Sequence, residues 1–133
     1  MSRLDELTKK LINVSEITEQ YRDGLTEYKL EKGSAFAVTL KHNEHVAVVQ
    51  SFLSAGTIFP YHNHTHSQEV LVVYEGVVVV VSDHERKELK AGDSLHICIG
   101  CGHLLHAKTD VKIIAITIPP DELAMPKDLK NGR

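Results

Sequence analysis

The chain has 133 residues, of which 42% are hydrophobic and 25% charged, values ordinary for one globular domain with a hydrophobic core. Its formal net charge of −3, without a cluster of basic residues, argues against a nucleic-acid-binding protein. No apolar run approaches the roughly 20 residues of a membrane helix, and the N-terminus lacks the apolar centre of a signal peptide, so we expect a cytoplasmic protein without a membrane partner.

The first residues show the spacing of an amphipathic helix. Leu4, Leu7 and Leu11 recur at helical intervals, and Ser2 precedes them as a capping residue. A second helical turn is expected around residues 15–21. We therefore predict that residues 1–27 form an N-terminal helical segment.

From residue 28 onward the pattern becomes that of short strands separated by turn-forming residues. About eight strands without helices between them indicate an all-β sandwich or barrel. We expect the barrel to span residues 28–120, because Pro119-Pro120 ends the last strand, and to be followed by a tail over residues 121–133. The predicted strands cover residues 35–41, 46–53, 57–62, 69–74, 77–82, 94–98, 103–108 and 111–118.

The predicted strand from Val77 to Val81 is apolar on both faces. One face fills the interior of a small barrel, so the other must also be covered. A second subunit is one cover, and we expect a homodimer on this ground. The chain's own N-terminal segment or opposing sheet is the alternative cover, with equal weight.

Two histidines and a glutamate form the most informative spacing in the chain. Side chains two residues apart on a strand point the same way, so His62 and His64 can present two imidazoles to one metal ion. Glu69 has the wrong parity for the same strand. It can join from the next strand if residues 63–68, which are rich in turn-formers, reverse the chain.

The stretch from Gly56 to Gly76 resembles the first sequence motif of the cupin superfamily, G-x5-H-x-H-x4-E-x6-G, at every specified position. The second cupin motif, G-x5-P-x-G-x2-H-x3-N, is similar to the segment that begins at Gly92. Both glycines and His103 match, whereas Cys98 replaces the proline and Ala107 the asparagine. Since those two positions are structural in the family, the departures concern the shape of a turn and leave the metal ligands intact.

The resemblance implies a double-stranded β-helix, or jelly-roll barrel, with one divalent transition metal inside. Carried over position by position, the metal ligands are His62, His64, Glu69 and His103. Imidazole and carboxylate ligands suit Fe, Mn, Ni, Zn and Cu alike, so the sequence does not choose among these metals. Four protein ligands on a six-coordinate ion leave two positions for water, substrate or dioxygen.

Other histidines and the two cysteines are weaker candidates. His66 is either a further ligand or a turn residue that faces solvent, and His96 points either into the barrel or outward. His106 lies three residues after His103, so we expect it to face the opposite side of its strand. Cys98 and Cys101 form a C-x-x-C pair, which is either a redox or zinc-binding pair or two small residues in a tight turn, with Cys101 near the mouth of the pocket.

We expect a metal-dependent enzyme of the oxygenase, isomerase, lyase or decarboxylase type that acts on a small polar, carboxylate or enol substrate. The alternatives are a non-catalytic module that binds or senses a small molecule and a barrel that the metal merely braces. The sequence does not decide whether the protein is catalytic. The pocket candidates are Phe59, Tyr61, Phe52 and Gln50.

Overall fold

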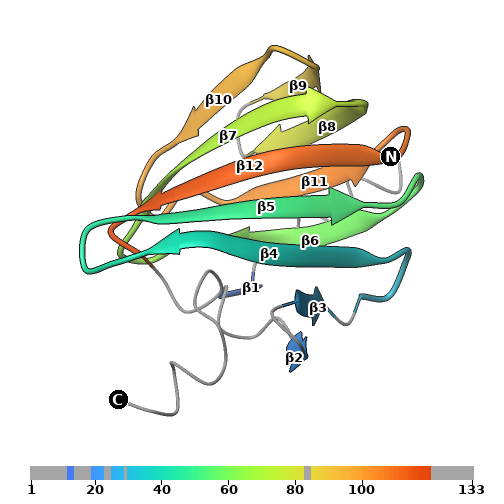
Figure 1. Ribbon diagram of the computed structural model, residues 1–133. Helices are drawn as coiled ribbons and strands as arrows, with labels where there is room; N and C mark the ends of the chain where they lie inside the picture. The colour runs from blue at the N-terminus through green and yellow to red at the C-terminus, as the bar shows by residue number, and fades with distance from the viewer. Residues whose placement is uncertain (1–11, 14–18, 23–24, 29, 83–84, 121–133) are drawn as a thin grey trace.

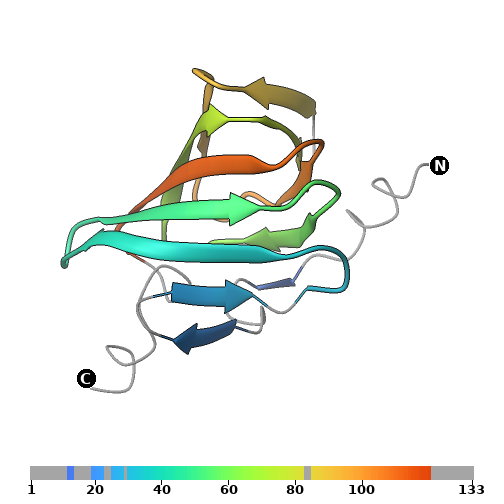
Figure 2. The same cartoon turned by 45° about the vertical axis from the view of Figure 1, so that its right-hand side comes forward.

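In a computed structural model of the protein, two β-sheets face each other and enclose the core (Figures 1 and 2). The structure describes residues 12–13, 19–22, 25–28, 30–82 and 85–120. One sheet has five strands in the order β1-β6-β11-β8-β9, and the other has seven in the order β10-β7-β12-β5-β4-β3-β2. The strands are β1 (Ile12–Asn13), β2 (Glu19–Arg22), β3 (Leu25–Tyr28), β4 (Ala35–His42), β5 (Ala47–Leu53), β6 (Ile58–Asn63), β7 (Gln68–Glu75), β8 (Val77–Ser82), β9 (Arg86–Lys90), β10 (Ser94–Ile97), β11 (His103–Ala107) and β12 (Val111–Ile118).

This architecture confirms the predicted all-β jelly-roll barrel, and each of the eight predicted strands is present. The described residues form no helix, so none that is long and apolar enough to cross a membrane. The sequence missed β9 because this edge strand buries Leu89 alone and exposes its other four residues. Its composition is therefore nearly that of a charged loop.

The N-terminal segment differs from the prediction where it is described. The helix expected around Leu4 to Leu11 lies outside the described residues. The helical turn predicted over residues 15–21 is wrong for its last residues, because Glu19–Arg22 forms β2 and pairs with β3, which in turn pairs with β4. The seven-stranded sheet supplies backbone hydrogen-bond partners that the local sequence does not reveal.

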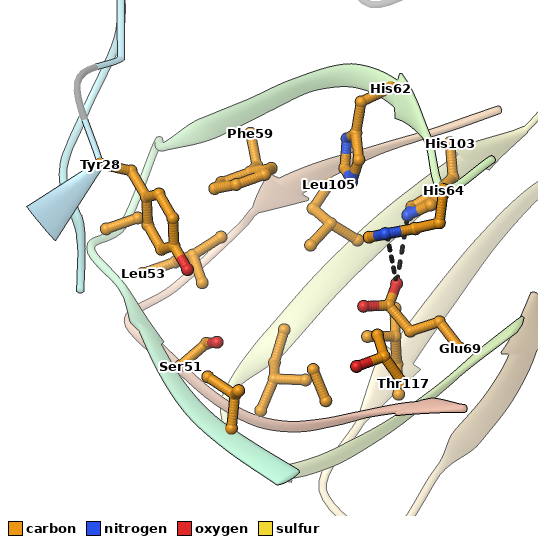
Figure 3. A pocket seen from close by; sticks show the side chains of 15 residues that line it. Tyr28, Ser51, Leu53, Phe59, His62, His64, Glu69, His103, Leu105 and Thr117 are labelled. Carbon is orange, nitrogen blue, oxygen red and sulfur yellow. Dashed lines mark ion pairs between the residues drawn. The ribbon is translucent and has the colours of Figure 1, made fainter. Parts of the chain in front are cut away.

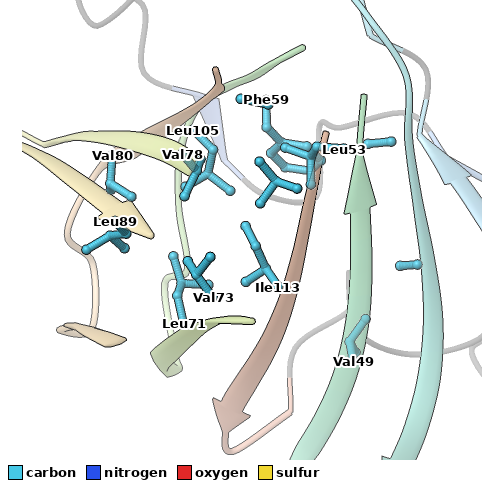
Figure 4. Packing of buried hydrophobic residues seen from close by; sticks show 14 of the residues in the cluster. Val49, Leu53, Phe59, Leu71, Val73, Val78, Val80, Leu89, Leu105 and Ile113 are labelled. Carbon is cyan, nitrogen blue, oxygen red and sulfur yellow. The ribbon is translucent and has the colours of Figure 1, made fainter. Parts of the chain in front are cut away.

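The core lies between the two sheets and is built from alternate residues of each strand (Figure 4). In β12, Val111 and Ile113 are buried at 1% exposure each, while Lys112 between them reaches the outside. In β7, Leu71 and Val73 take the same inward parity. Because Glu69 and Thr117 share the parity of these core residues, their side chains also face the interior.

Strand β8 is buried on both faces by the chain itself. Val78 and Val80 belong to the core between the sheets. Val79 and Val81 belong to a second cluster on the other face of their sheet, with Ile58, Tyr61 and Leu104. The apolar run from Val77 to Val81 thus needs no second subunit as a cover, and the alternative of cover within the chain is confirmed.

Candidate metal centre

A β-bulge in β6 aims the first of the expected ligands into the barrel. His103 of β11 pairs with His62, but Leu105, two residues on, pairs with Phe59, so β6 contains one extra residue between these pairs. The bulge turns Phe59 and His62 to the same interior face although they are three residues apart. Pro60 lies in the bulge, where a residue without a backbone N–H is tolerated.

Two imidazoles are held by backbone carbonyl groups. Nδ1 of His62 lies 2.6 Å from the carbonyl oxygen of Pro60, and Nδ1 of His103 lies 3.1 Å from that of Cys101. Since the carbonyl oxygens can only accept, each neutral ring carries its proton on Nδ1. The Nε2 atoms are then left with the lone pair that a metal ion requires.

His64 and Glu69 complete the group from both sides of the barrel. His64 follows β6, whereas Glu69 lies at the start of β7 in the opposite sheet, so the chain reverses between them as predicted. Oε1 of Glu69 lies 3.3 Å from Nε2 of His64 and 3.2 Å from Nε2 of His103 (Figure 3). Exposure is 1–3% for the three histidines and 7% for the glutamate, so none is an ordinary surface residue.

The donor set fits a divalent transition metal. Ligand atoms of His62, His64 and His103 all lie within 4.8 Å of one another, which is the compact arrangement that one ion needs. The carboxylate of Glu69 lies beside two of these three histidines, His64 and His103. Three neutral imidazoles and one carboxylate are ligands that Zn, Fe, Mn, Ni and Cu accept, so the chemistry of the side chains does not separate these metals.

The environment keeps the donors in the charge states that metal binding requires. Burial, with the neighbouring His103 and His64, lowers the pKa of His62 well below its ordinary value. Burial by itself raises the pKa of Glu69, but the close approach of His103 and His64 outweighs it and holds the pKa well below its usual range. The imidazole of His62 therefore stays neutral, and the carboxylate stays ionised, at neutral pH.

The four side chains line one end of an interior cavity of about 60 Å³ (Figure 3). Its walls are mostly apolar, and Lys and Arg are absent from the described residues that line it. Besides the four expected ligands, the lining includes Phe59, Leu53, Leu71, Leu105 and Ile113 as apolar walls and Tyr28, Ser51 and Thr117 as polar groups.

The pocket residues expected from the sequence are partly wrong. Phe59 lines the cavity, but the bulge in β6 sends Tyr61 outward into the second cluster. Phe52 and Gln50 lie on the outer face, because Ser51 between them has the inward parity.

Sequence reasoning missed three polar residues of the lining. Tyr28 belongs to β3, a strand that the sequence did not predict. Ser51 and Thr117 could have been found, since they continue the alternation of buried residues in β5 and β12.

None of the other candidate histidines joins the centre. His66 is exposed in the turn after His64, as the solvent-facing interpretation predicted. His96 is exposed on the outside of its sheet, where Nε2 lies 2.8 Å from Oε1 of Gln68. His106 pairs with Ile58 on the face opposite to His103, which confirms the expectation from parity.

The two cysteines form a disulfide bond that closes the turn between β10 and β11. This turn contacts two of the ligand histidines through its backbone. The amide of Gly100 donates a hydrogen bond to the carbonyl of His64 over 2.9 Å, and the carbonyl of Cys101 accepts from His103. The disulfide thus braces the backbone that orients part of the metal centre.

The closing glycine of the first motif has a steric role. Gly76 has a φ of +87°, a conformation that side chains disfavour, and an added Cβ would collide with the carbonyl oxygen of Asp110. This glycine lets the turn between β7 and β8 pack against the turn between β11 and β12.

Comparisons with known proteins agree with this geometry. An uncharacterised protein of Methanocaldococcus jannaschii is 28% identical over 116 residues, which cover 83% of this chain and 92% of that protein. An RmlC-like cupin from Shewanella frigidimarina superposes with a TM-score of 0.63 at 24% identity, covering 86% of this chain and 95% of that one. A predicted oxalate decarboxylase from Thermotoga maritima superposes with a TM-score of 0.62 at 21% identity, and the match covers 84% of this chain and 100% of that one. At these identities the two structures show a shared fold.

The family to which the chain belongs is shown by a match between its sequence and a protein-family model. The model described as a cupin domain matches residues 49–119, a span that holds three of the expected ligands on the first motif and the fourth on the second. The chain belongs to the cupin family.

Proposed function

We propose that this cupin binds one divalent transition-metal ion through His62, His64, His103 and Glu69 and acts as an enzyme on a small oxygen-bearing molecule. The observation that carries the proposal is the position of the donors in the wall of a cavity. A structural metal site is closed by protein ligands, whereas a catalytic site keeps an open side. Here the three histidines face both one another and the cavity.

When bound, such an ion supplies Lewis-acid polarisation of a substrate oxygen or a binding position for dioxygen. The chain's own groups prepare the surroundings. The carbonyls of Pro60 and Cys101 fix the tautomers of two ligands, and Glu69 offsets one of the two positive charges. Apolar walls such as Phe59 and Leu105 exclude water and so strengthen every electrostatic contact within the cavity.

The reaction types that fit are those of an oxygenase, isomerase, decarboxylase or other lyase with a small polar, carboxylate or enol substrate. The Thermotoga neighbour is described as a predicted oxalate decarboxylase, which favours a small oxygen chelator as the class of ligand. The alternative is a module that holds such a ligand without converting it.

An exchangeable water on the metal tests the proposal. We expect protein loaded with Mn²⁺ to enhance water-proton relaxation, and a small chelator to reduce the enhancement by displacing that water. A loaded protein without exchangeable water would point to a structural ion and contradict the enzyme proposal. If chelators displace water but none of the tested substrates is converted, the binding module is favoured.

We further propose a second copy of the chain as a protein partner. The outer face of the seven-stranded sheet carries half-buried apolar side chains in rows across four strands, which a second sheet would cover. These side chains are Val38, Val48, Val70, Val72, Ile114 and Ile116.

Light scattering on Ile114→Lys tests this surface. Ile114 lies near the centre of the outer face, so a buried charge there should convert a dimer to a monomer. Ile99→Lys is the matched control, because Ile99 is 56% exposed on the disulfide turn and away from this face. A wild-type protein that is monomeric at micromolar concentration would contradict the proposal.

We also propose a cytoplasmic location for this cupin. The disulfide bears on it because a reducing compartment opens such bonds. Cell fractionation with a count of free thiols in each fraction tests the location. Recovery of the protein outside the cytoplasm would contradict it.

A further inference from the structure

Thr117 brings a hydroxyl group without a protein partner to the metal end of the cavity. The residue is 3% exposed, and its Oγ1 has no hydrogen-bond partner among the described residues. It stands in register opposite Glu69 on the neighbouring strand, and both side chains line the cavity (Figure 3). Directly opposed residues of an antiparallel pair have Cβ atoms roughly 5 Å apart, so the hydroxyl lies beside the carboxylate.

A buried hydroxyl that lacks a partner destabilises a protein, whereas valine has the same shape without the polar atom. The other buried threonine with described contacts, Thr57, bonds both the amide and the carbonyl of Ser34. Thr117 instead lines the cavity beside Glu69 (Figure 3). Its natural partner is a molecule that enters this space.

The charges of the lining limit what that molecule can be. A divalent ion with Glu69 and three neutral imidazoles has a net charge of about +1. The remaining polar lining groups, Tyr28, Ser51 and Thr117, are neutral. A ligand with one negative charge balances the centre, while a dianion leaves an uncompensated charge among apolar walls, which is costly.

We propose, resting on the metal site above, that Thr117 hydrogen-bonds the metal-bound ligand and that this ligand is a singly charged chelator with two oxygen donors, such as an enolate. Its uncharged body lies along Phe59 and Leu53, toward the neutral hydroxyls of Tyr28 and Ser51 (Figure 3). Thr117 is thus a positioning residue for the ligand and plays no part in holding the ion.

Spectroscopic titration of the Co²⁺-loaded protein tests both parts, with acetohydroxamate as the singly charged probe and oxalate as the dianion. We expect Thr117→Val to keep its Co²⁺ affinity and to bind acetohydroxamate about tenfold more weakly, the effect of one hydrogen bond. Thr117→Ser should stay within about threefold of the wild type. Thr26→Val is the matched control, because Thr26 is buried but does not line the cavity.

Equal acetohydroxamate affinity in the wild type and Thr117→Val would overturn the role of Thr117. For the ligand class, each probe's affinity is divided by its affinity for free Co²⁺, and we expect a higher ratio for acetohydroxamate than for oxalate. An equal or higher ratio for oxalate overturns the singly charged class. Failure of the wild type to bind Co²⁺ overturns the metal site itself, and this proposal with it.

Discussion

His62 and His103 stand directly opposite each other on β6 and β11, and their ring centroids lie 4.2 Å apart. The register of one antiparallel strand pair therefore sets the distance between two of the three clustered imidazoles. His64 extends the set one residue beyond the end of β6, and its ring stacks on that of His103 at 5.3 Å. Because rigid strands carry two of the three rings, the centre is largely organised before an ion binds.

The buried imidazole of His62 makes the metal-free protein sensitive to acid. Its pKa is lowered well below 6.5 in the folded chain, so between that lowered value and 6.5 the unfolded chain binds more protons. We expect the free energy of unfolding to fall as the pH drops below about 6.5, by at most ~1.4 kcal/mol per pH unit. Urea denaturation at several pH values measures the slope.

His62→Gln is the control for this slope, since glutamine does not titrate. The variant should show a flatter dependence below pH 6.5. An identical slope in both proteins would assign the acid sensitivity to other groups. Glu69 acts in a separate window, because its lowered pKa makes its contribution vanish only as the pH falls below 4.5.

Gly76→Ala should destabilise the protein more than Gly92→Ala. Both glycines have positive φ values, of +87° and +97°, so both substitutions introduce backbone strain of about 1–2 kcal/mol. The alanine Cβ at position 76 also meets the carbonyl of Asp110, whereas at position 92 nothing lies within 4 Å. This overlap adds about 1–3 kcal/mol. Equal denaturation midpoints for the two variants would contradict the steric account.

Removing the disulfide should weaken metal binding. The turn that it closes carries the Cys101 carbonyl that orients His103 and the Gly100 amide that bonds to His64. We expect the double variant Cys98→Ser and Cys101→Ser to lose up to about tenfold in metal affinity, the lower end of the effect of disturbing a ligand's hydrogen-bond partner. Calorimetric titration with Zn²⁺ measures it, and unchanged affinity would show that the turn holds its shape unaided.

Thr117→Val should stabilise the ligand-free protein by about 1 kcal/mol, because it removes a buried hydroxyl that lacks a protein partner. The same substitution at Thr57, to valine, should destabilise the protein. Thr57 is 0% exposed and bonds to Ser34 through its hydroxyl, so valine there costs about 2 kcal/mol. Thermal denaturation of both variants gives the comparison. A loss of stability in Thr117→Val would mean that its hydroxyl is satisfied.

The sequence predicted the parts of the fold that depend on local residue patterns. Strands such as β7 and β12 were identifiable because short apolar runs are bounded by turn-forming residues. The histidine spacing similarly placed the expected ligands, since two imidazoles two residues apart must share a face. Local patterns do not reveal an edge strand such as β9, in which Leu89 alone is buried.

What the sequence missed depends on pairing between strands. The bulge that sends Tyr61 outward is defined by the register of β6 against β11, which no local pattern contains. Tyr28 reaches the cavity because β3 adds to the sheet through β4. Similarly, the apolar run from Val77 to Val81 indicates a strand that is buried on both faces. Only the folded structure shows that both faces are buried within the chain itself.

Metal content is the most direct test of the central claim that the clustered histidines hold an ion. We expect elemental analysis of protein purified without added metal, or reloaded with Zn²⁺, to give about one transition-metal ion per chain. His62→Ala and His103→Ala should each lose most of it, while His106→Ala, whose side chain lies on the opposite face, should keep it. Unchanged metal content in both ligand variants, or a wild-type protein that binds none, would contradict the account.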